Sequence, residues 1–318
     1  MHLRGVLTEG IAVSTAVFAA DRTAAREQGA ATNALLWGLK TVGMWLTLLV
    51  STVVATKLVP LNVPLPKPDG PLSIQQALLA VNGLTAISLS LLAANARVRW
   101  ARLAGLLFVA LFGIQTAVMQ IEIFYFNESI KMPAEVVLGV GAQQTIVALI
   151  ACAMGALLFH PADEAPHPVP ADVFARVALL SVSYVALYYA AGFFIAWQSP
   201  VVRAYYGNAA HIAMLPTIAV QLVRGAMFAL ISLFVVTGLK GSLARRAAVM
   251  AVLFVVLTAG QLLYPNPMVP WAVRQVHLIE VGTSEFVYGV VATFLLLGGA
   301  ARRPLSGGSA WRLIAGRA

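Results

Sequence analysis

The sequence predicts an all-α fold, a polytopic transmembrane helical bundle of about eight spans. Hydrophobic residues make up 60% of the 318 residues and charged residues make up 10%, whereas soluble domains carry about 25% charged residues. The hydrophobic residues are grouped in long runs, and about 20 such residues are enough to cross the hydrocarbon core of a bilayer. The lysines and arginines lie in short clusters between these runs, which is the pattern of a membrane protein.

Eight apolar runs can be drawn along the chain, and each predicts one spanning helix. Their approximate ranges are 35–57, 75–95, 103–122, 134–158, 174–197, 212–238, 247–264 and 275–299. Inside a bilayer a helix satisfies its own backbone hydrogen bonds, and exposed irregular backbone does not. The runs also lack the alternating pattern of a transmembrane β-barrel strand. They therefore predict helices.

The positions of the cationic residues predict the orientation. With the N-terminus inside, 14 of the 21 Lys and Arg residues fall in inner segments and five in outer segments, and two lie within spans. This excess predicts cytoplasmic N- and C-termini and a multi-pass protein of the inner (plasma) membrane. It also accounts for the net charge of +9 without a nucleic-acid partner, because the cations mark membrane boundaries and form no basic groove. The lipid bilayer is the expected partner.

These features divide the chain into five predicted segments. They are a cytoplasmic N-terminal segment at 1–34, a first four-helix half at 35–158, a Pro-rich and acidic cytoplasmic linker at 159–173, a second four-helix half at 174–299 that carries the polar site, and a basic cytoplasmic tail at 300–318. Within the first segment, the apolar stretch 11–20 is short and follows Glu9. We interpret it as a surface or interfacial helix, with a signal segment as the alternative.

The linker contains residues that raise the question of a metal site. His160 and His167 lie in the same stretch as Asp163 and Glu164, and all four are potential ligands. The stretch 160–172 also contains four prolines. Such a composition favours an extended, solvated linker over a ligand cage.

The two halves resemble a weak internal repeat. The stretch VNGLTAISLSLL before one basic turn matches VRGAMFALISLF before another, which aligns Asn82-Gly83 with Arg224-Gly225, and Met132-Pro133 aligns with Val269-Pro270. Because four spans separate the copies, the halves share one orientation. The expectation is a parallel 4+4 repeat about an axis along the membrane normal.

The last predicted span carries most of the ionisable residues at membrane depth. They are Arg274, His277, Glu280 and Glu285. At 100° per residue, Arg274 and Glu285 lie about 20° apart around the helix, and His277 lies about 60° from Arg274. Charged residues at this depth are costly, so they are candidates for function.

Arg224, in the sixth predicted span, lies at a similar depth in the membrane. Arg224 has Gln221 one turn away on the same face, and an unpaired charge in this position would be strongly disfavoured. We therefore predict an ion pair between Arg224 and Glu285. This pair forms the floor of a predicted polar cavity, open to the outside and lined by the other polar residues of the last span. Such a cavity suits a small polar or anionic solute, or a proton relay through His277; the alternative is a pair that only locks two helices together.

Other chemistries find little support in the sequence. His277 and Glu280 have the i, i+3 spacing of some metal ligands, but the remaining candidates, Glu122, Glu128 and Glu135, are more easily interpreted as loop and interface residues. Cys152 is the single cysteine, which excludes an intrachain disulfide and a cysteine cage. No Ser-His-Asp set, P-loop or dinucleotide fingerprint is present. We predict no metal, no cofactor and no catalytic residue.

Three segments resemble a pattern in uncharacterised bacterial multi-spanning membrane proteins. They are VRG at 223–225, YPNPMVP at 264–270 and VRQVHLIE at 273–280. The resemblance covers roughly residues 220–290. It implies a recurring unit and carries no known activity.

The leading functional prediction is a transporter or channel-like protein for a small polar or anionic solute, supported by the spans, the repeat and the mid-membrane charges. A membrane-embedded enzyme that uses His277, Glu280 and Arg274 is an alternative. An accessory subunit of a membrane complex, with purely structural charges, is the other. We lean against an enzyme because no catalytic motif is found.

Overall fold

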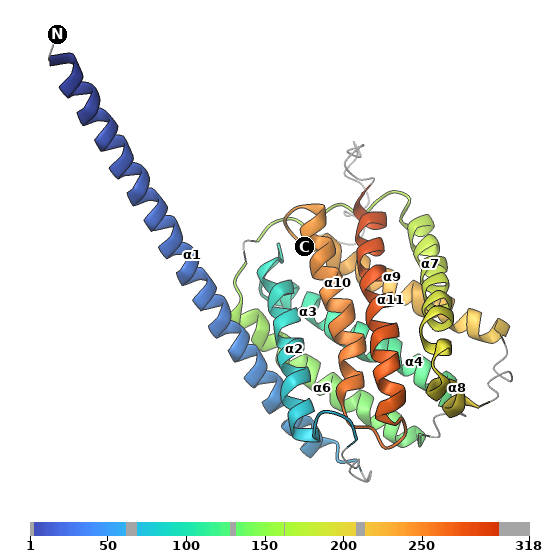
Figure 1. Cartoon of the computed structure of the whole chain (residues 1–318). Helices are drawn as coiled ribbons and strands as arrows, with labels where there is room; N and C mark the ends of the chain where they lie inside the picture. Colours follow the sequence, from blue (N-terminus) through green and yellow to red (C-terminus); the bar gives the residue numbers. More distant parts are fainter. Residues whose placement is uncertain (1–2, 62–68, 128–131, 162, 208–213, 299–318) are drawn as a thin grey trace, which may run out of the picture. The chain divides into compact units, whose positions relative to one another are not determined.

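A computed structural model covers the chain and describes residues 3–61, 69–127, 132–161, 163–207 and 214–298, with side chains from residue 31 onward. Within these ranges the regular elements are helices, as predicted (Figure 1). In chain order they are α1 (Leu3–Leu58), α2 (Ile74–Ala94), α3 (Ala101–Phe112), the π-helix η1 (Gly113–Ala117), α4 (Val118–Tyr125), α6 (Ala134–Leu158), α7 (Val173–Phe194), η2 (Ala196–Gln198), α8 (Pro200–Tyr206), α9 (Met214–Thr237), α10 (Leu243–Ala259), η4 (Gly260–Leu263) and α11 (Trp271–Leu297).

Eight helical stretches are long and apolar enough to span a membrane, which confirms the predicted number. They are Ala31–Leu58, Ile74–Ala94, Ala101–Tyr125, Ala134–Leu158, Val173–Gln198, Met214–Thr237, Leu243–Leu263 and Trp271–Leu297. The seventh and eighth begin earlier than the hydropathy pattern predicts. Ser242 caps α10 by accepting a hydrogen bond from the Arg245 amide, and α11 starts directly after Pro270, so polar first turns are helical too.

The chain divides into two compact units, Met1–Gly43 and Met44–Ala318. In the first unit, residues 3–43 belong to α1, which is one continuous helix from Leu3 to Leu58. The predicted segment 1–34 is therefore helical from Leu3 and has no break before the first span. Its interfacial position stays a prediction, and the predicted tail 300–318 lies outside the described residues.

The helices of the second unit pack in pairs. α10 packs along α11, α7 along α9 and α3 along α6, and the pairs α2–α10 and α3–α9 join the two halves. Glycines allow the closest approaches: a Cβ at Gly289 would lie 2.9 Å from the backbone of Ala251, and one at Gly225 would lie 2.9 Å from that of Ser181. Small residues at helix crossings are typical of membrane proteins.

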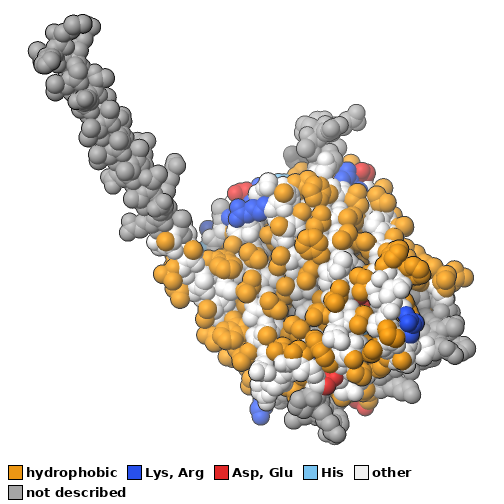
Figure 2. All heavy atoms as spheres, in the orientation of Figure 1, with side chains coloured by type: hydrophobic (Ala, Val, Ile, Leu, Met, Phe, Trp, Pro, Cys, Tyr) orange, Lys and Arg blue, Asp and Glu red, His pale blue; other side chains and the backbone are white. Residues whose placement is uncertain are grey.

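The surface of the second unit is apolar. Figure 2 shows hydrophobic side chains over most of the visible face, with few charged ones. Large side chains such as Phe174 and Phe194 are 86% and 71% exposed, which would be unfavourable in water over so wide an area. These features fit an integral membrane protein in contact with lipid.

The two basic turns of the bundle pair with each other. Ala96 and Leu239 form an antiparallel bridge, in which the Arg97 amide donates to the Gly238 carbonyl over 2.8 Å and the Lys240 amide donates to the Asn95 carbonyl over 2.8 Å. This contact joins the turn between α2 and α3 to the turn between α9 and α10.

The acidic linker is anchored to these turns, which the prediction of a solvated linker did not include. The Glu164 amide donates to the Arg97 carbonyl, and the His167 amide donates to the Thr237 carbonyl. Ion pairs of 2.7 Å join Arg97 to Glu164 and Arg102 to Asp163. The carboxylates remain exposed as predicted, but the basic turns hold them in place. The prolines alone do not reveal these partners.

Candidate functional site

Arg224 lies in the middle of α9 and is 2% exposed. Its Nη2 atom is 2.7 Å from Oε2 of Glu122, and its Nη1 atom donates to Oε1 of Gln221 over 2.7 Å. The adjacent glycine at 225 lets α7 approach closely, so that the Arg224 guanidinium lies 5.5 Å from the centre of the Tyr184 ring. The prediction that Arg224 pairs with Glu285 is wrong: its ion-pair partner is Glu122 of the first half.

Glu122 reaches Arg224 from a helix that is not regular. The third span contains the π-helix Gly113–Ala117 between α3 and α4. A π-turn inserts an extra residue, which rotates all following side chains by about 100° around the axis. Met119 and Glu122 follow this turn, and both contact the Arg224 guanidinium. π-Helices are frequent at functional sites.

Glu285 of α11 belongs to the same group but has a different environment. It is 4% exposed, it interacts with the Tyr184 side chain, and it lies within electrostatic range of both Arg224 and Glu122. We call Glu122, Gln221, Arg224 and Glu285 the central cluster. It contains two carboxylates and one guanidinium.

The central cluster contains polar atoms that find no partner among the described residues. They are Nε2 of Gln221, Nε of Arg224 and Oε2 of Glu285, all buried. Buried polar atoms are nearly always hydrogen-bonded, so this cluster has two donors and one acceptor available to water, an ion or a solute.

An aromatic group lies one turn beyond the central cluster. Tyr288 of α11 donates to the Gly225 carbonyl over 3.3 Å, and its ring packs against those of Phe228 and Phe254. Tyr184 completes this group through edge contacts with Phe228 and Tyr288. The group separates the cluster from the ends of α9 and α11 that carry the basic turn and the C-terminus.

His277 and Glu280 form a second polar group toward the start of α11. The His277 Nδ1 atom lies 2.5 Å from Oε2 of Glu280, and its Nε2 atom lies 3.1 Å from the Tyr206 hydroxyl of α8. We call these three residues the outer triad. Burial raises the pKa of Tyr206, and the nearby negative charges of Glu122 and Glu280 raise it further, which keeps the hydroxyl protonated.

The outer triad and the central cluster are neighbours. The charges of Glu122, Arg224 and Glu280 act on Tyr188 of α7. The charges of Glu122 and Glu280 also act on Tyr206. Tyr188 and Tyr206 are therefore within electrostatic range of charges from both groups.

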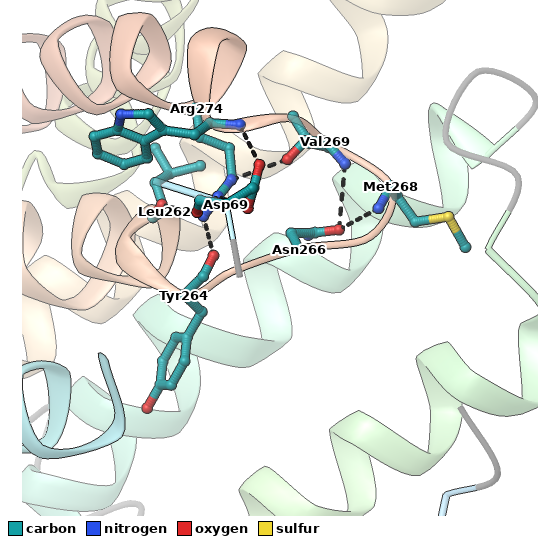
Figure 3. A network of polar contacts seen from close by, with 8 residues as sticks. Asp69, Leu262, Tyr264, Asn266, Met268, Val269 and Arg274 are labelled. Atoms are coloured by element: carbon teal, nitrogen blue, oxygen red, sulfur yellow. Dashed lines mark hydrogen bonds and ion pairs between the residues drawn. The ribbon is translucent and has the colours of Figure 1, made fainter. Parts of the chain in front are cut away.

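Arg274 is not part of either group, although the sequence places it on the same stripe. Figure 3 shows its guanidinium inside the turn that precedes α11. Its Nε donates to the Val269 carbonyl over 2.9 Å, its Nη1 to the carbonyls of Leu262 and Tyr264, and its Nη2 to the backbone and carboxylate of Asp69. These bonds use all five N–H groups of the guanidinium.

Asp69 reinforces this clamp. Its Oδ1 lies 2.5 Å from the Arg274 Nη2, and its Oδ2 accepts the Trp271 amide over 2.6 Å, which satisfies a free N–H at the start of α11. In the turn itself, Asn266 accepts from the amides of Met268 and Val269. Arg274 therefore builds a rigid turn and does not line a polar path.

The structure brings together Gln221, Arg224 and Glu285, places His277 and Glu280 beside them, and separates Arg274. Sequence reasoning interpreted Glu122 as a loop or interface residue, which is wrong because Glu122 lies in α4 and pairs with Arg224. It missed Tyr184, Tyr188 and Tyr206. Among the described residues there is no group of three or more His, Cys, Asp or Glu side chains that could hold a metal ion. The sequence resemblance noted for residues 220–290 stays a prediction, since the chain matches no protein-family model, no curated protein and no solved structure.

Proposed function

We propose that the protein moves a small polar or anionic solute across the membrane and that the central cluster is its binding site. The single observation that carries this proposal is the set of unpaired buried atoms of Gln221, Arg224 and Glu285. An ion pair that served only to join helices would be expected to satisfy these atoms. The two free donors suit a carboxylate or carbonyl of the solute, and the free Oε2 of Glu285 suits a polar group of the solute.

The position of the cluster between the two halves supports this role. Glu122 comes from the first half and Arg224 and Glu285 from the second, and transporters built from repeats bind their substrates at the repeat interface near the midplane.

We further propose that the halves form the parallel repeat expected from the sequence. The Ala96–Leu239 bridge joins the two basic turns that follow the matched segments VNGLTAISLSLL and VRGAMFALISLF. The aligned residues Ser90 and Ser232 are both fully buried. With the basic turns on the cytoplasmic side, both termini of this plasma-membrane protein are inside.

Ligand-dependent stability and uptake test the proposal. We expect one class of small polar or anionic solutes to raise the unfolding temperature of the purified full-length protein, because a ligand that binds the folded state stabilises it. The same solutes should enter proteoliposomes that contain the wild type. Arg224→Gln and Glu285→Gln should abolish both effects, whereas Glu135→Gln, at an exposed position of α6, should not. Uptake that persists in both cluster variants would contradict the proposal.

The outer triad favours a second candidate, a membrane-embedded enzyme. A hydroxyl, an imidazole and a carboxylate in hydrogen-bonded series resemble the arrangement that activates a nucleophile, here with Tyr206, His277 and Glu280 in these positions. Arg274 does not contribute, because its N–H groups are engaged. This candidate expects His277→Ala to abolish turnover of a solute that still binds the central cluster. If no solute binds or moves, the charges support the third reading, an accessory subunit.

A further inference from the structure

The charges of the central cluster do not balance. Arg224 carries one positive charge at any physiological pH, while Glu122 and Glu285 would carry two negative charges if both were ionised. A net charge in a site where Arg224 is 2% and Glu285 is 4% exposed is strongly disfavoured, since a buried charge needs a compensating partner. One additional positive charge would make the cluster neutral.

The groups around the carboxylates do not supply that charge. Glu285 faces Arg224, Glu122 and Tyr184, and Tyr288 lies next to it on α11. Tyr188 of α7 lies within electrostatic range of Glu122, Arg224 and Glu280. Among the charged groups that act on Glu285 in the part of the chain that the structure describes, Arg224 is the one cation, and the same guanidinium forms the ion pair with Glu122. The imidazole of His277 is hydrogen-bonded to Glu280 and Tyr206.

We propose that the central cluster binds one proton, which Glu122 and Glu285 share, and that Arg224 pairs with whichever carboxylate has lost it. The structure holds the arrangement in which Arg224 pairs with Glu122 at 2.7 Å and Glu285 carries the proton. In the other arrangement Arg224 pairs with Glu285, and the proton is on Glu122. One proton is transferred from one carboxylate to the other, no atom is gained or lost, and both arrangements are neutral.

The two carboxylates differ in how far they are buried inside the bundle. The Glu122 side chain is 23% exposed, whereas Glu285 lies deeper, against Tyr184 and above the aromatic group. We therefore expect the proton to enter and leave the cluster through Glu122. Tyr206 of the outer triad lies within electrostatic range of Glu122, and the His277 imidazole, which is hydrogen-bonded to Tyr206 and Glu280, can pass protons between them.

The shared proton lies in the same site as the proposed solute. Only its consequence, that solute movement is coupled to proton movement, rests on the proposed function. A switch of Arg224 between carboxylates from different halves changes how the halves are joined. A ligand or proton that favours one arrangement would then shift the population between two states.

Infrared spectroscopy tests the proton directly, without knowledge of the solute. A protonated carboxyl group absorbs apart from carboxylates, and exchange into D₂O identifies it. At neutral pH, the purified full-length wild type and the Glu135→Gln control should each show the band of one protonated carboxyl group per chain. Glu285→Gln and Glu122→Gln should both lose it, because one remaining carboxylate and Arg224 are already neutral together. Arg224→Gln should increase the band to two groups.

Each outcome decides the question. A wild type without the band overturns the proposal, even if every variant fails to fold. A band that disappears in Glu285→Gln but persists in Glu122→Gln also overturns it, since the proton would then belong to Glu285 through burial alone. Loss in both single variants with retention in the Glu135→Gln control supports a shared proton. Because solute uptake is not measured, a failure of the transport proposal leaves this result unaffected.

Discussion

The Nη2 atom of Arg224 in α9 lies 2.7 Å from Oε2 of Glu122 in α4, so a buried ion pair connects the second half of the bundle to the first. In a bilayer this contact matters more than at a protein surface, because neither charge can be fully hydrated at this depth. It also means that Glu285 is available for a different role.

The Arg224–Glu122 contact predicts a strong dependence of stability on both residues. Removing one partner of a buried pair costs about 3–5 kcal/mol. We expect the loss to stay at the lower end of that range for Glu122→Gln, because its side chain is 23% exposed and Glu285 remains within electrostatic range of Arg224. The charge reversal Arg224→Glu with Glu122→Arg should recover part of the loss in thermal unfolding of the purified protein.

The matched comparison uses Glu285. The reversal Arg224→Glu with Glu285→Arg should recover less, because Glu285 is not the ion-pair partner in this arrangement. Equal rescue by both double variants would contradict the assignment of Glu122.

The fold could be predicted from hydropathy, but the partners within it could not. The eight runs and the basic turns reflect the free energy of placing apolar and charged residues in a bilayer, which depends on local sequence. The partner of Arg224 depends instead on the rotation of the third span after the π-helix Gly113–Ala117. A regular period of 3.6 residues cannot reveal that rotation.

The role of Arg274 in the turn before α11 was not predicted either, although the sequence of that turn indicates it. The preceding turn contains Pro265, Pro267 and Pro270, and proline has no N–H group to donate. Carbonyls in such a turn need an outside donor, and a guanidinium has five N–H groups. Helical periodicity groups side chains by the helix face on which they lie. It therefore predicts that Arg274 lies on the same face as Glu285.

The clamp predicts that Arg274 is essential for stability and not for solute binding. Arg274→Lys keeps the charge but cannot reach the carbonyls of Leu262, Tyr264 and Val269 together. We expect a loss of about 2–4 kcal/mol in the free energy of unfolding, as for a buried, hydrogen-bonded charge. Asp69→Asn should cause a smaller loss that is not additive with it.

Two further measurements distinguish a structural role of Arg274 from a role in solute binding. The infrared carboxyl band and any ligand-induced rise in unfolding temperature should survive Arg274→Lys in the protein that remains folded. Loss of ligand binding without loss of stability would show that Arg274 lines the solute path after all.

Helix packing predicts opposite effects for two glycines. A Cβ at Gly289 would lie 2.9 Å from the backbone of Ala251, whereas one at Gly105 would have no described atom within 4 Å. Gly289→Ala should therefore destabilise the α10–α11 contact by about 1–3 kcal/mol through overpacking. Gly105→Ala should be neutral or stabilising by up to about 1 kcal/mol, because alanine favours a helix. Unfolding measurements in one detergent compare the two, and equal effects would contradict the close crossing.

His167 predicts that the linker is released in acid. Its pKa is lowered to about 4 by burial and by the charges of Arg246 and Arg97, against the usual value of 6.5. A released linker therefore binds a proton more readily than a docked one, so docking is fully stable above about pH 6.5 and weakens as the pH falls toward 4. The Glu164 pKa is lowered, mainly by its hydrogen bond to Arg97, so that ion pair persists through most of this range.

Hydrogen exchange at the two anchoring amides measures this release. The amides of Glu164 and His167, which donate to Arg97 and Thr237, should lose protection between pH 6.5 and 4 relative to helix amides corrected for intrinsic exchange. His167→Asn removes the titrating group and should make the protection nearly independent of pH in this window. If the wild type and His167→Asn lose protection in parallel, another group controls docking, and the protonation of His167 has no consequence for the linker.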